Sequence, residues 1–115
     1  MDCQKLFSFH FLYTYTYFIT IATNYRYNSV TPFFQKFKNY AYGHDRNSHI
    51  FSVKEYTNRT HGLHYHILYF TNKKLDYFKV HEKMPSHTDI NIQLVPKTKR
   101  DIKKVLSYML KNQII

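Results

Sequence analysis

The segment Leu6–Ala22 contains seventeen residues and no Asp, Glu, Lys or Arg. It is about as long as the shortest helix that spans a membrane, roughly 17 residues. However, one His, one Ser and three Thr interrupt it, and its many Phe and Tyr residues are typical of β-strands. Because strands rarely exceed about ten residues, we predict a core strand over Tyr17–Thr23, preceded by an aromatic extension or extra strand over residues 1–16. The N-terminus has no basic cluster and no small-residue cleavage site of the kind that marks a signal peptide.

Three helices are predicted downstream, each beginning after a residue suited to a helix N-cap. The first N-cap is Thr31, with Pro32 at the first helical position, and the second is Asn72. The third is Thr98, which forms a variant capping box with Asp101. Gly43 is expected to end the first helix, and Pro85 to end the second, which covers about Lys73–Met84. Apolar residues at helical spacing continue the third helix to the C-terminus.

Three further strands are predicted over Ser48–Tyr56, Leu63–Thr71 and Asp89–Val95. The first two are separated by a short segment suited to a hairpin loop. The resulting order, β-α-β-β-α-β-α, is that of an α+β, ferredoxin-like (split βαβ) fold with an added C-terminal helix. We expect an antiparallel sheet with helices on one face, in a single domain over residues 17–115.

The chain has 17 Lys and Arg against 7 Asp and Glu, which gives a formal net charge of +10. This excess favours a polyanionic partner. The 19% aromatic content favours nucleic acid over a membrane surface, because bases stack on aromatic rings. The alternative is a solvated basic surface without a partner. A single Cys excludes an internal disulfide and indicates a reducing compartment, and two Gly residues are too few for the common phosphate-binding loops.

A strand in the middle of the chain carries His64 and His66, which project from the same face because side chains alternate along a strand. Glu55 lies on the preceding strand, and a hairpin loop centred near Arg59 brings it opposite one of these histidines. A one-residue slip of the register turns Glu55 to the other face. Two imidazoles and a carboxylate suit a divalent metal ion with open coordination positions. The alternatives are ordinary strand residues without a metal, or a site that uses His61 in place of one of the pair.

The C-terminal helix carries Tyr108 on its polar side, away from the apolar stripe, with Lys111 one turn further on. This placement suits a phenol that attacks a phosphodiester beside a lysine that offsets the developing negative charge. The alternative is a boundary tyrosine beside a solvated lysine.

Together these residues resemble the motifs of the HUH endonuclease superfamily, in particular the small Rep initiators of rolling-circle-type replication with a single catalytic tyrosine. Phe18–Ile21 looks like the first-motif strand, His64–His66 matches the His-bulky-His motif, and Tyr108–Lys111 matches the Tyr-x-x-Lys motif. Glu55 stands in the place of the acidic third metal ligand. The resemblance extends over most of the chain, from Tyr17 to Asn112, although the first motif is loose and no helicase domain follows.

The resemblance implies a metal-dependent endonuclease that nicks and rejoins single-stranded DNA. In such an enzyme Mg²⁺ or Mn²⁺ held by Glu55, His64 and His66 polarises the scissile phosphate. Tyr108 attacks this phosphate, forming a 5′-phosphotyrosine and freeing a 3′-hydroxyl, while Lys111 orients the phosphate or offsets its charge. The implied partners are an origin or terminus sequence in single-stranded DNA, a second copy of the chain, and a helicase or polymerase supplied by others. The implied location is the cytoplasm of a cell that hosts a virus or plasmid.

Further DNA contacts are expected from aromatic and basic residues. The predicted base-stacking residues are Tyr25, Tyr27 and Tyr65. The predicted phosphate contacts are Arg26, Lys54, Arg59, Lys73 and Lys104.

Three other functions are open at the level of the sequence. A single-tyrosine transposase shares the His-bulky-His strand and the helical Tyr, although Lys111 and the short gap before Tyr108 favour a replication initiator. A non-catalytic ferredoxin-like nucleic-acid-binding module explains the charge and the rings but leaves the His pair, Glu55 and Tyr108 as coincidence. A structural or interaction protein is the third.

Overall fold

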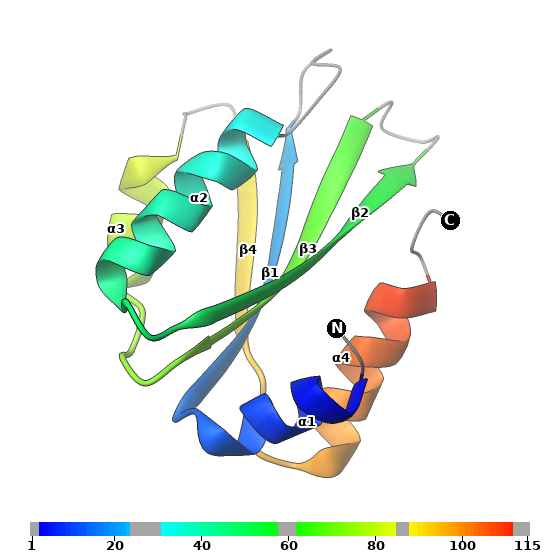
Figure 1. Ribbon diagram of the computed structural model, residues 1–115. Helices are drawn as coiled ribbons and strands as arrows, with labels where there is room; N and C mark the ends of the chain where they lie inside the picture. Colours follow the sequence, from blue (N-terminus) through cyan, green and yellow to red (C-terminus); the bar gives the residue numbers. More distant parts are fainter. Residues whose placement is uncertain (1–2, 24–30, 58–61, 85–87, 112–115) are drawn as a thin grey trace.

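The computed structural model describes residues 3–23, 31–57, 62–84 and 88–111. In chain order its elements (Figure 1) are α1 (Cys3–Leu12), β1 (Tyr15–Thr23), α2 (Thr31–His44), β2 (His49–Thr57), β3 (Gly62–Thr71), α3 (Tyr77–Lys83), β4 (Thr88–Leu94) and α4 (Lys99–Lys111). The strands form one sheet in the order β2-β3-β1-β4, and all neighbouring strands are antiparallel. The chain therefore has the predicted α+β class, and its strand order is compatible with a split βαβ arrangement.

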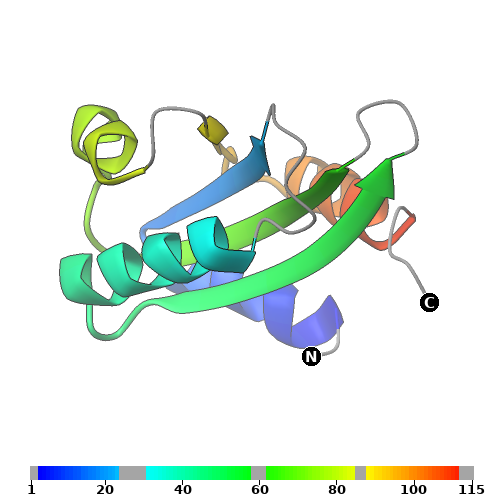
Figure 2. The ribbon, with the colours of Figure 1, turned by 90° about the horizontal axis from the view of Figure 1, so that it is seen from above.

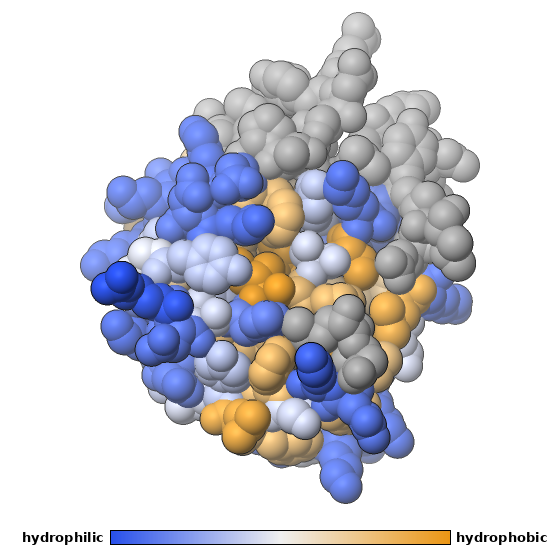
Figure 3. Space-filling model, in the orientation of Figure 1, coloured by the Kyte–Doolittle hydropathy of each residue, from blue (hydrophilic) through white to orange (hydrophobic). Residues whose placement is uncertain are grey.

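Helices cover both faces of the sheet: α2 and α3 lie on one face, and α1 and α4 lie on the other (Figures 1 and 2). The core beneath α2 and α3 includes Tyr17, Ile19, Ile21, Phe37, Ala41, Tyr65, Ile67, Tyr69 and Val80. The core beneath α1 and α4 consists of Leu6, Val53, Leu68, Phe70, Ile102, Leu106 and Met109. In Figure 3, hydrophilic residues cover much of the outer helical surface, and hydrophobic residues gather between the helices. The two helices of the split βαβ units thus share one face as predicted, and the added helix α4 packs on the other.

The N-terminal part of the uncharged segment forms a helix, not the extra strand that was one of the two expectations. α1 buries Leu6 and His10, which lie one turn apart on the same side of the helix. Packing against α4 and the sheet overrides the β-strand propensity of the Phe and Tyr residues in this segment. In the ranges that the structure describes, no helix has the length and hydropathy needed to cross a membrane.

The predicted start of the second helix is wrong because a later residue caps it. α3 begins at Tyr77, and the Asp76 carboxylate accepts a hydrogen bond of 3.0 Å from the backbone N–H of Phe78. Asn72, the predicted cap, instead accepts a hydrogen bond of 2.9 Å from the backbone N–H of Thr14. The contact between Asn72 and Thr14, which are far apart in the sequence, takes Asn72 away from the helix, and Asp76 caps it instead.

The ends of the other two predicted helices are close to those observed. α2 continues through Gly43 and ends at His44; the side chains of its first residues, including the predicted N-cap Thr31, lie outside the described residues. At the start of α4, the backbone N–H of Asp101 donates a 3.0 Å hydrogen bond to Thr98 Oγ1, as the capping-box prediction requires.

The buried side chain of His10 joins α1 to β1 and to the turn before α4. Its Nε2 lies 2.9 Å from the carbonyl oxygen of Pro96, and its Nδ1 lies 2.8 Å from Thr16 Oγ1. Because a carbonyl oxygen only accepts, Nε2 carries the hydrogen and Nδ1 accepts from the Thr16 hydroxyl in the neutral ring. Burial and then the Lys97 ammonium lower the pKa of His10, and these effects outweigh the raising effects of the Pro96 carbonyl and Asp101.

We expect His10 to make the folded state sensitive to acid. Since the pKa of His10 is lower in the folded than in the unfolded chain, the unfolded state binds more protons below about pH 7. The free energy of unfolding therefore falls as the pH drops from 8 to 5. Urea unfolding across this range should show a shallower pH dependence for His10→Gln than for the wild type.

His81→Gln is the matched control, because this histidine is exposed on α3 and its replacement should leave the pH dependence unchanged. Identical slopes for the wild type and His10→Gln would show that the buried network does not titrate as described.

Candidate active site

The two sides of β3 carry different kinds of residue. Tyr65, Ile67 and Tyr69 face α2 and α3 and belong to the core on that side. The alternate positions face α1 and α4, where His66 is followed by the buried Leu68. His64 and His66 therefore share the face that α4 covers.

The register of the hairpin brings Glu55 to the same face. Glu55 pairs with His64, and Val53, which packs beneath α4, pairs with His66. This is the register on which the predicted grouping depended. On the other side of β3, Thr20 of β1 pairs with His66, so residues from three strands meet at this point.

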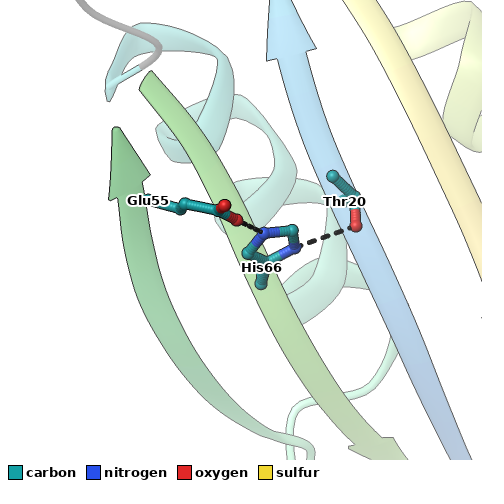
Figure 4. A network of polar contacts seen from close by, with 3 residues as sticks. All are labelled: Thr20, Glu55 and His66. Atoms are coloured by element: carbon teal, nitrogen blue, oxygen red, sulfur yellow. Dashed lines mark hydrogen bonds and ion pairs between the residues drawn. The ribbon is translucent and has the colours of Figure 1, made fainter. Parts of the chain in front are cut away.

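His66 lies between Glu55 and Thr20 (Figure 4). Its Nε2 makes a short hydrogen-bond contact with Glu55 Oε2, and its Nδ1 lies 3.1 Å from Thr20 Oγ1. Because a carboxylate only accepts, we assign the hydrogen to Nε2, and Nδ1 of the neutral ring then accepts from the Thr20 hydroxyl. The side chain of His66 is 3% exposed and that of Glu55 17%, so this polar group is largely sealed from water.

His64 lies beside this buried pair in a half-buried position. Burial lowers its pKa, the Glu55 carboxylate raises it, His66 lowers it and Asp89 of β4 raises it, with a net shift downward. The neutral imidazole is therefore the dominant form of His64 at neutral pH, and it is the form that binds metals.

The predicted metal ligands lie on one face of the sheet, the face that α4 covers, but they are not arranged as a metal-binding site. Among the described residues, no group of three or more His, Cys, Asp or Glu side chains is arranged to hold a metal ion. Glu55 and His66 instead bond to each other. The donor types suit Mg²⁺ or Mn²⁺ through the carboxylate and other first-row ions through the imidazoles, so metal binding stays a prediction.

Tyr108 packs edge-on against this group from α4. Its ring centroid lies 5.3 Å from that of His66 and 6.0 Å from that of Phe18, with interplanar angles of 79° and 81°. Phe18 and His66 in turn stack on each other, at 5.8 Å between centroids. These ring contacts hold Tyr108 against the His66–Glu55 pair. Because Tyr108 is 48% exposed, part of the residue also reaches the surface.

A cavity of about 380 Å³ opens beside Tyr108, between the end of β4 and α4. Phe18 and Tyr108 form part of its wall, together with Lys104, one of the predicted phosphate contacts. Lys111 is exposed at the end of α4, one turn beyond Tyr108.

Other predicted DNA contacts lie away from this group. Tyr65 is 3% exposed and stacks on Phe34 of α2 at 4.3 Å between centroids, so its predicted role in stacking on bases is wrong. Lys54 lies on the opposite face from Glu55, with its Nζ 5.6 Å from the centroid of the Tyr65 ring. Lys73 follows the far end of β3.

The remaining predicted contacts, Tyr25, Arg26, Tyr27 and Arg59, lie outside the described residues.

Comparison with known proteins assigns the chain to a family. A family model described as "Virus, 117-like" matches residues 12–112. The chain belongs to the 117-like viral family. It is 61% identical over 110 residues to "Uncharacterized protein 117" of Sulfolobus islandicus rod-shaped virus 1, covering 96% of this chain and 94% of that protein. It also matches a crystal structure of the hypothetical protein ORF119 from the same virus, with a TM-score of 0.83, 61% identity, and coverage of 97% of this chain and 94% of the other.

This match overturns the assignment to the HUH endonuclease superfamily. The family that matches is that of the viral 117-like proteins, over nearly the whole of the described chain. The motifs that suggested the other family are three or four residues long, and such short patterns arise easily in a chain rich in Tyr, His and Lys. Of the two origins expected, viral or plasmid, the family found is viral.

Three contributors to the site in this 117-like protein were given no role there by the sequence, although two of them lie in the predicted first-motif strand Phe18–Ile21. Thr20 bonds to His66, Phe18 stacks on it, and Asp89 influences His64. They lie on β1 and β4, and only the pairing of these strands with each other and with β3 brings them to the histidines. No spacing rule within one segment identifies such residues.

We expect Glu55→Ala to destabilise this 117-like protein by roughly 1–3 kcal/mol, because it leaves the buried Nε2–H of His66 without its acceptor. Glu55→Gln keeps an acceptor oxygen and should cost less. Urea unfolding at pH 7.5 measures both, with Glu82→Ala on the exposed side of α3 as the control. A Glu55→Ala protein as stable as the wild type would contradict the pairing of Glu55 with His66.

Proposed function

We propose that this viral protein is a replication-initiating endonuclease that nicks and rejoins single-stranded DNA through Tyr108. The observation that carries the proposal is the edge-on contact of the Tyr108 ring with His66, which is itself bonded to Glu55. The partly exposed phenol of Tyr108 on α4 thus lies beside the buried imidazole of His66 and the carboxylate of Glu55. The whole chain carries a net charge of +10. This grouping suits nucleophilic attack on a phosphodiester.

The ring contact positions Tyr108 and is not itself a proton-transfer contact. Both nitrogens of His66 are bonded elsewhere, to Glu55 and to Thr20. His66 therefore acts on Tyr108 through packing, and together with Phe18 it limits the directions in which the phenol ring can turn. A fixed nucleophile removes part of the entropic cost of attack.

In the proposed reaction the Tyr108 oxygen bonds to phosphorus and the bond from phosphorus to the 3′-oxygen breaks. The phenol loses a proton and the leaving 3′-oxygen gains one, so the products are a 5′-phosphotyrosine and a 3′-hydroxyl. Because one phosphoester replaces another, the 3′-hydroxyl can attack the phosphotyrosine and restore the strand. Two lysines supply positive charge for the phosphate. Lys111 is exposed one turn beyond Tyr108, and Lys104 lines the same cavity as Tyr108.

The proposed cofactor is Mg²⁺ or Mn²⁺, with Glu55, His64 and His66 as its ligands. Holding it would require the contact between Glu55 and His66 to open and His66 Nε2 to give up its hydrogen, because these two side chains bond to each other in the structure. When bound, such an ion acts as a Lewis acid on the phosphate oxygen. Support for it comes from the three donors sharing one face of adjacent strands, with Glu55 directly opposite His64.

We expect Tyr108→Phe to abolish covalent capture of DNA while leaving the fold intact, because it removes only the nucleophilic oxygen. The assay incubates the protein with labelled single-stranded oligonucleotides from the viral genome termini and Mn²⁺, then detects an SDS-resistant adduct. Tyr77→Phe and Tyr42→Phe are matched controls, since these tyrosines have similar exposures of 44% and 43% and lie on helices of the other face.

An adduct formed by Tyr108→Phe would exclude this nucleophile. Binding of the strands without cleavage under any metal condition would favour a non-catalytic nucleic-acid-binding protein.

We expect the same adduct to disappear in EDTA and to return on addition of Mn²⁺. His64→Ala should lower adduct formation by tenfold or more, because it removes one proposed ligand, whereas His81→Ala on exposed α3 should not change it. Calorimetric titration with Mn²⁺ should show binding to the wild type and weaker binding to His64→Ala. Full activity in EDTA would contradict a metal-dependent reaction.

A further inference from the structure

The cavity beside Tyr108 has the shape and lining of a small-ligand site. Its volume of about 380 Å³ falls within the range of ligand pockets, roughly 300–1,000 Å³. Apolar groups of Phe18, Pro96 and Val105 form much of its wall, and Tyr108 borders it. It lies between the end of β4 and α4, at the edge of the core beneath α1 and α4, against which Phe18 and Val105 pack.

Three polar side chains also line this cavity: Gln93 from β4, and Asp101 and Lys104 from α4. Gln93 offers two donor hydrogens and an acceptor oxygen, the combination that pairs with the edge of a base. Asp101 accepts a hydrogen bond from Thr98, and a carboxylate retains acceptor sites beyond one such bond. An apolar wall with a few polar groups is the usual composition of a site that selects an organic ligand.

We propose that this cavity holds the base of the nucleotide next to the phosphate attacked by Tyr108, and that Gln93 reads the edge of that base. The inference rests on the proposed function, since it takes Tyr108 as the nucleophile.

A nucleobase is the occupant that the surroundings favour. Tyr108 belongs both to the proposed reaction and to the cavity wall, and a phosphate at its hydroxyl places the neighbouring nucleotide within a few ångströms. Lys104 in the lining matches the negative charge of the strand, and the chain as a whole carries +10. The rings of Phe18 and Tyr108 lie edge to face at 6.0 Å between centroids, which gives the wall aromatic surface for contact with a base.

The polar lining also favours particular bases. Asp101 is an acceptor only, so it matches an exocyclic amino group, and Gln93 pairs well with the amino and ring nitrogens of adenine. Thymine presents carbonyl oxygens where adenine and cytosine present an amino group. We therefore expect adenine or cytosine at this position and discrimination against thymine.

The test measures binding and so does not depend on cleavage. A randomised single-stranded DNA library is selected for binding in EDTA by the wild type, by Gln93→Ala and by Val105→Phe, which fills the cavity. Sequencing of the bound pools should show, for the wild type, one position with a preference of about fivefold or more for adenine or cytosine over thymine. Gln93→Ala and Val105→Phe should reduce this preference below twofold at that position alone. Gln35→Ala, an exposed glutamine on α2, should keep it.

Mapping the bond cleaved by the wild type then locates the selected position. A preference next to the scissile bond that is lost in both cavity variants supports the inference. The same base preference in wild type, Gln93→Ala and Val105→Phe would overturn it, even if Tyr108 cleaves DNA as proposed. A preference lost in both variants, with no cleavage of any strand by the wild type, would establish the base pocket and reject the proposed reaction. Circular dichroism of each variant excludes loss of fold as the cause.

Discussion

The alternation of side chains along β3, a strand covered by helices on both faces, is the constraint on which the rest of the structure depends. Every second residue must fit the core beneath α2 and α3, and the residues between them must fit beneath α1 and α4. A shift of one residue would bury His64 and His66 among the rings of α2 and turn Tyr65 and Ile67 towards α4. Because the apolar residues of β3 are buried on both faces of the sheet, they determine which face His64 and His66 point to, more firmly than the contacts of the histidines themselves.

The same constraint explains why a polar group is tolerated so close to the core. His66 is almost fully buried, and both of its ring nitrogens are bonded, one to Glu55 and one to Thr20. A buried imidazole without those partners would carry the full cost of desolvation. The neighbouring strands supply one partner each, so the sheet and the polar group stabilise each other.

The sequence predicted the elements whose signals are local. β1 follows from its Phe, Tyr and Thr content, β4 follows from its alternating residues, and α4 follows from the Thr98–Asp101 cap and an apolar stripe at helical spacing. α1 was not predicted, because its Phe residues have the propensities of a strand and only packing against α4 and the sheet makes them helical. The start of α3 was misplaced because Asn72 was the predicted cap, whereas its side chain bonds to Thr14 and Asp76 caps the helix.

The candidate site was predictable to a similar extent. The shared face of His64 and His66 follows from their spacing, whereas the position of Glu55 depends on a hairpin register that the sequence leaves free. Tyr65 shows the limit of composition, because the residue between two histidines on one face must point to the other, where it is buried against Phe34. Short motifs described the chemistry of the residues but did not identify the family.

The contacts of His10 have a consequence for the order in which the protein folds. They join α1 to Pro96, 86 residues further along the chain, and to Lys97. Closing a loop of this length costs conformational entropy before any contact repays it. During synthesis, α1 can pack on β2 and β3 as soon as they form, but the contacts with Pro96 and α4 have to wait until the last part of the chain has been made. The surface that carries Tyr108 is therefore completed late, and the growing chain cannot form it while the rest of the sheet assembles.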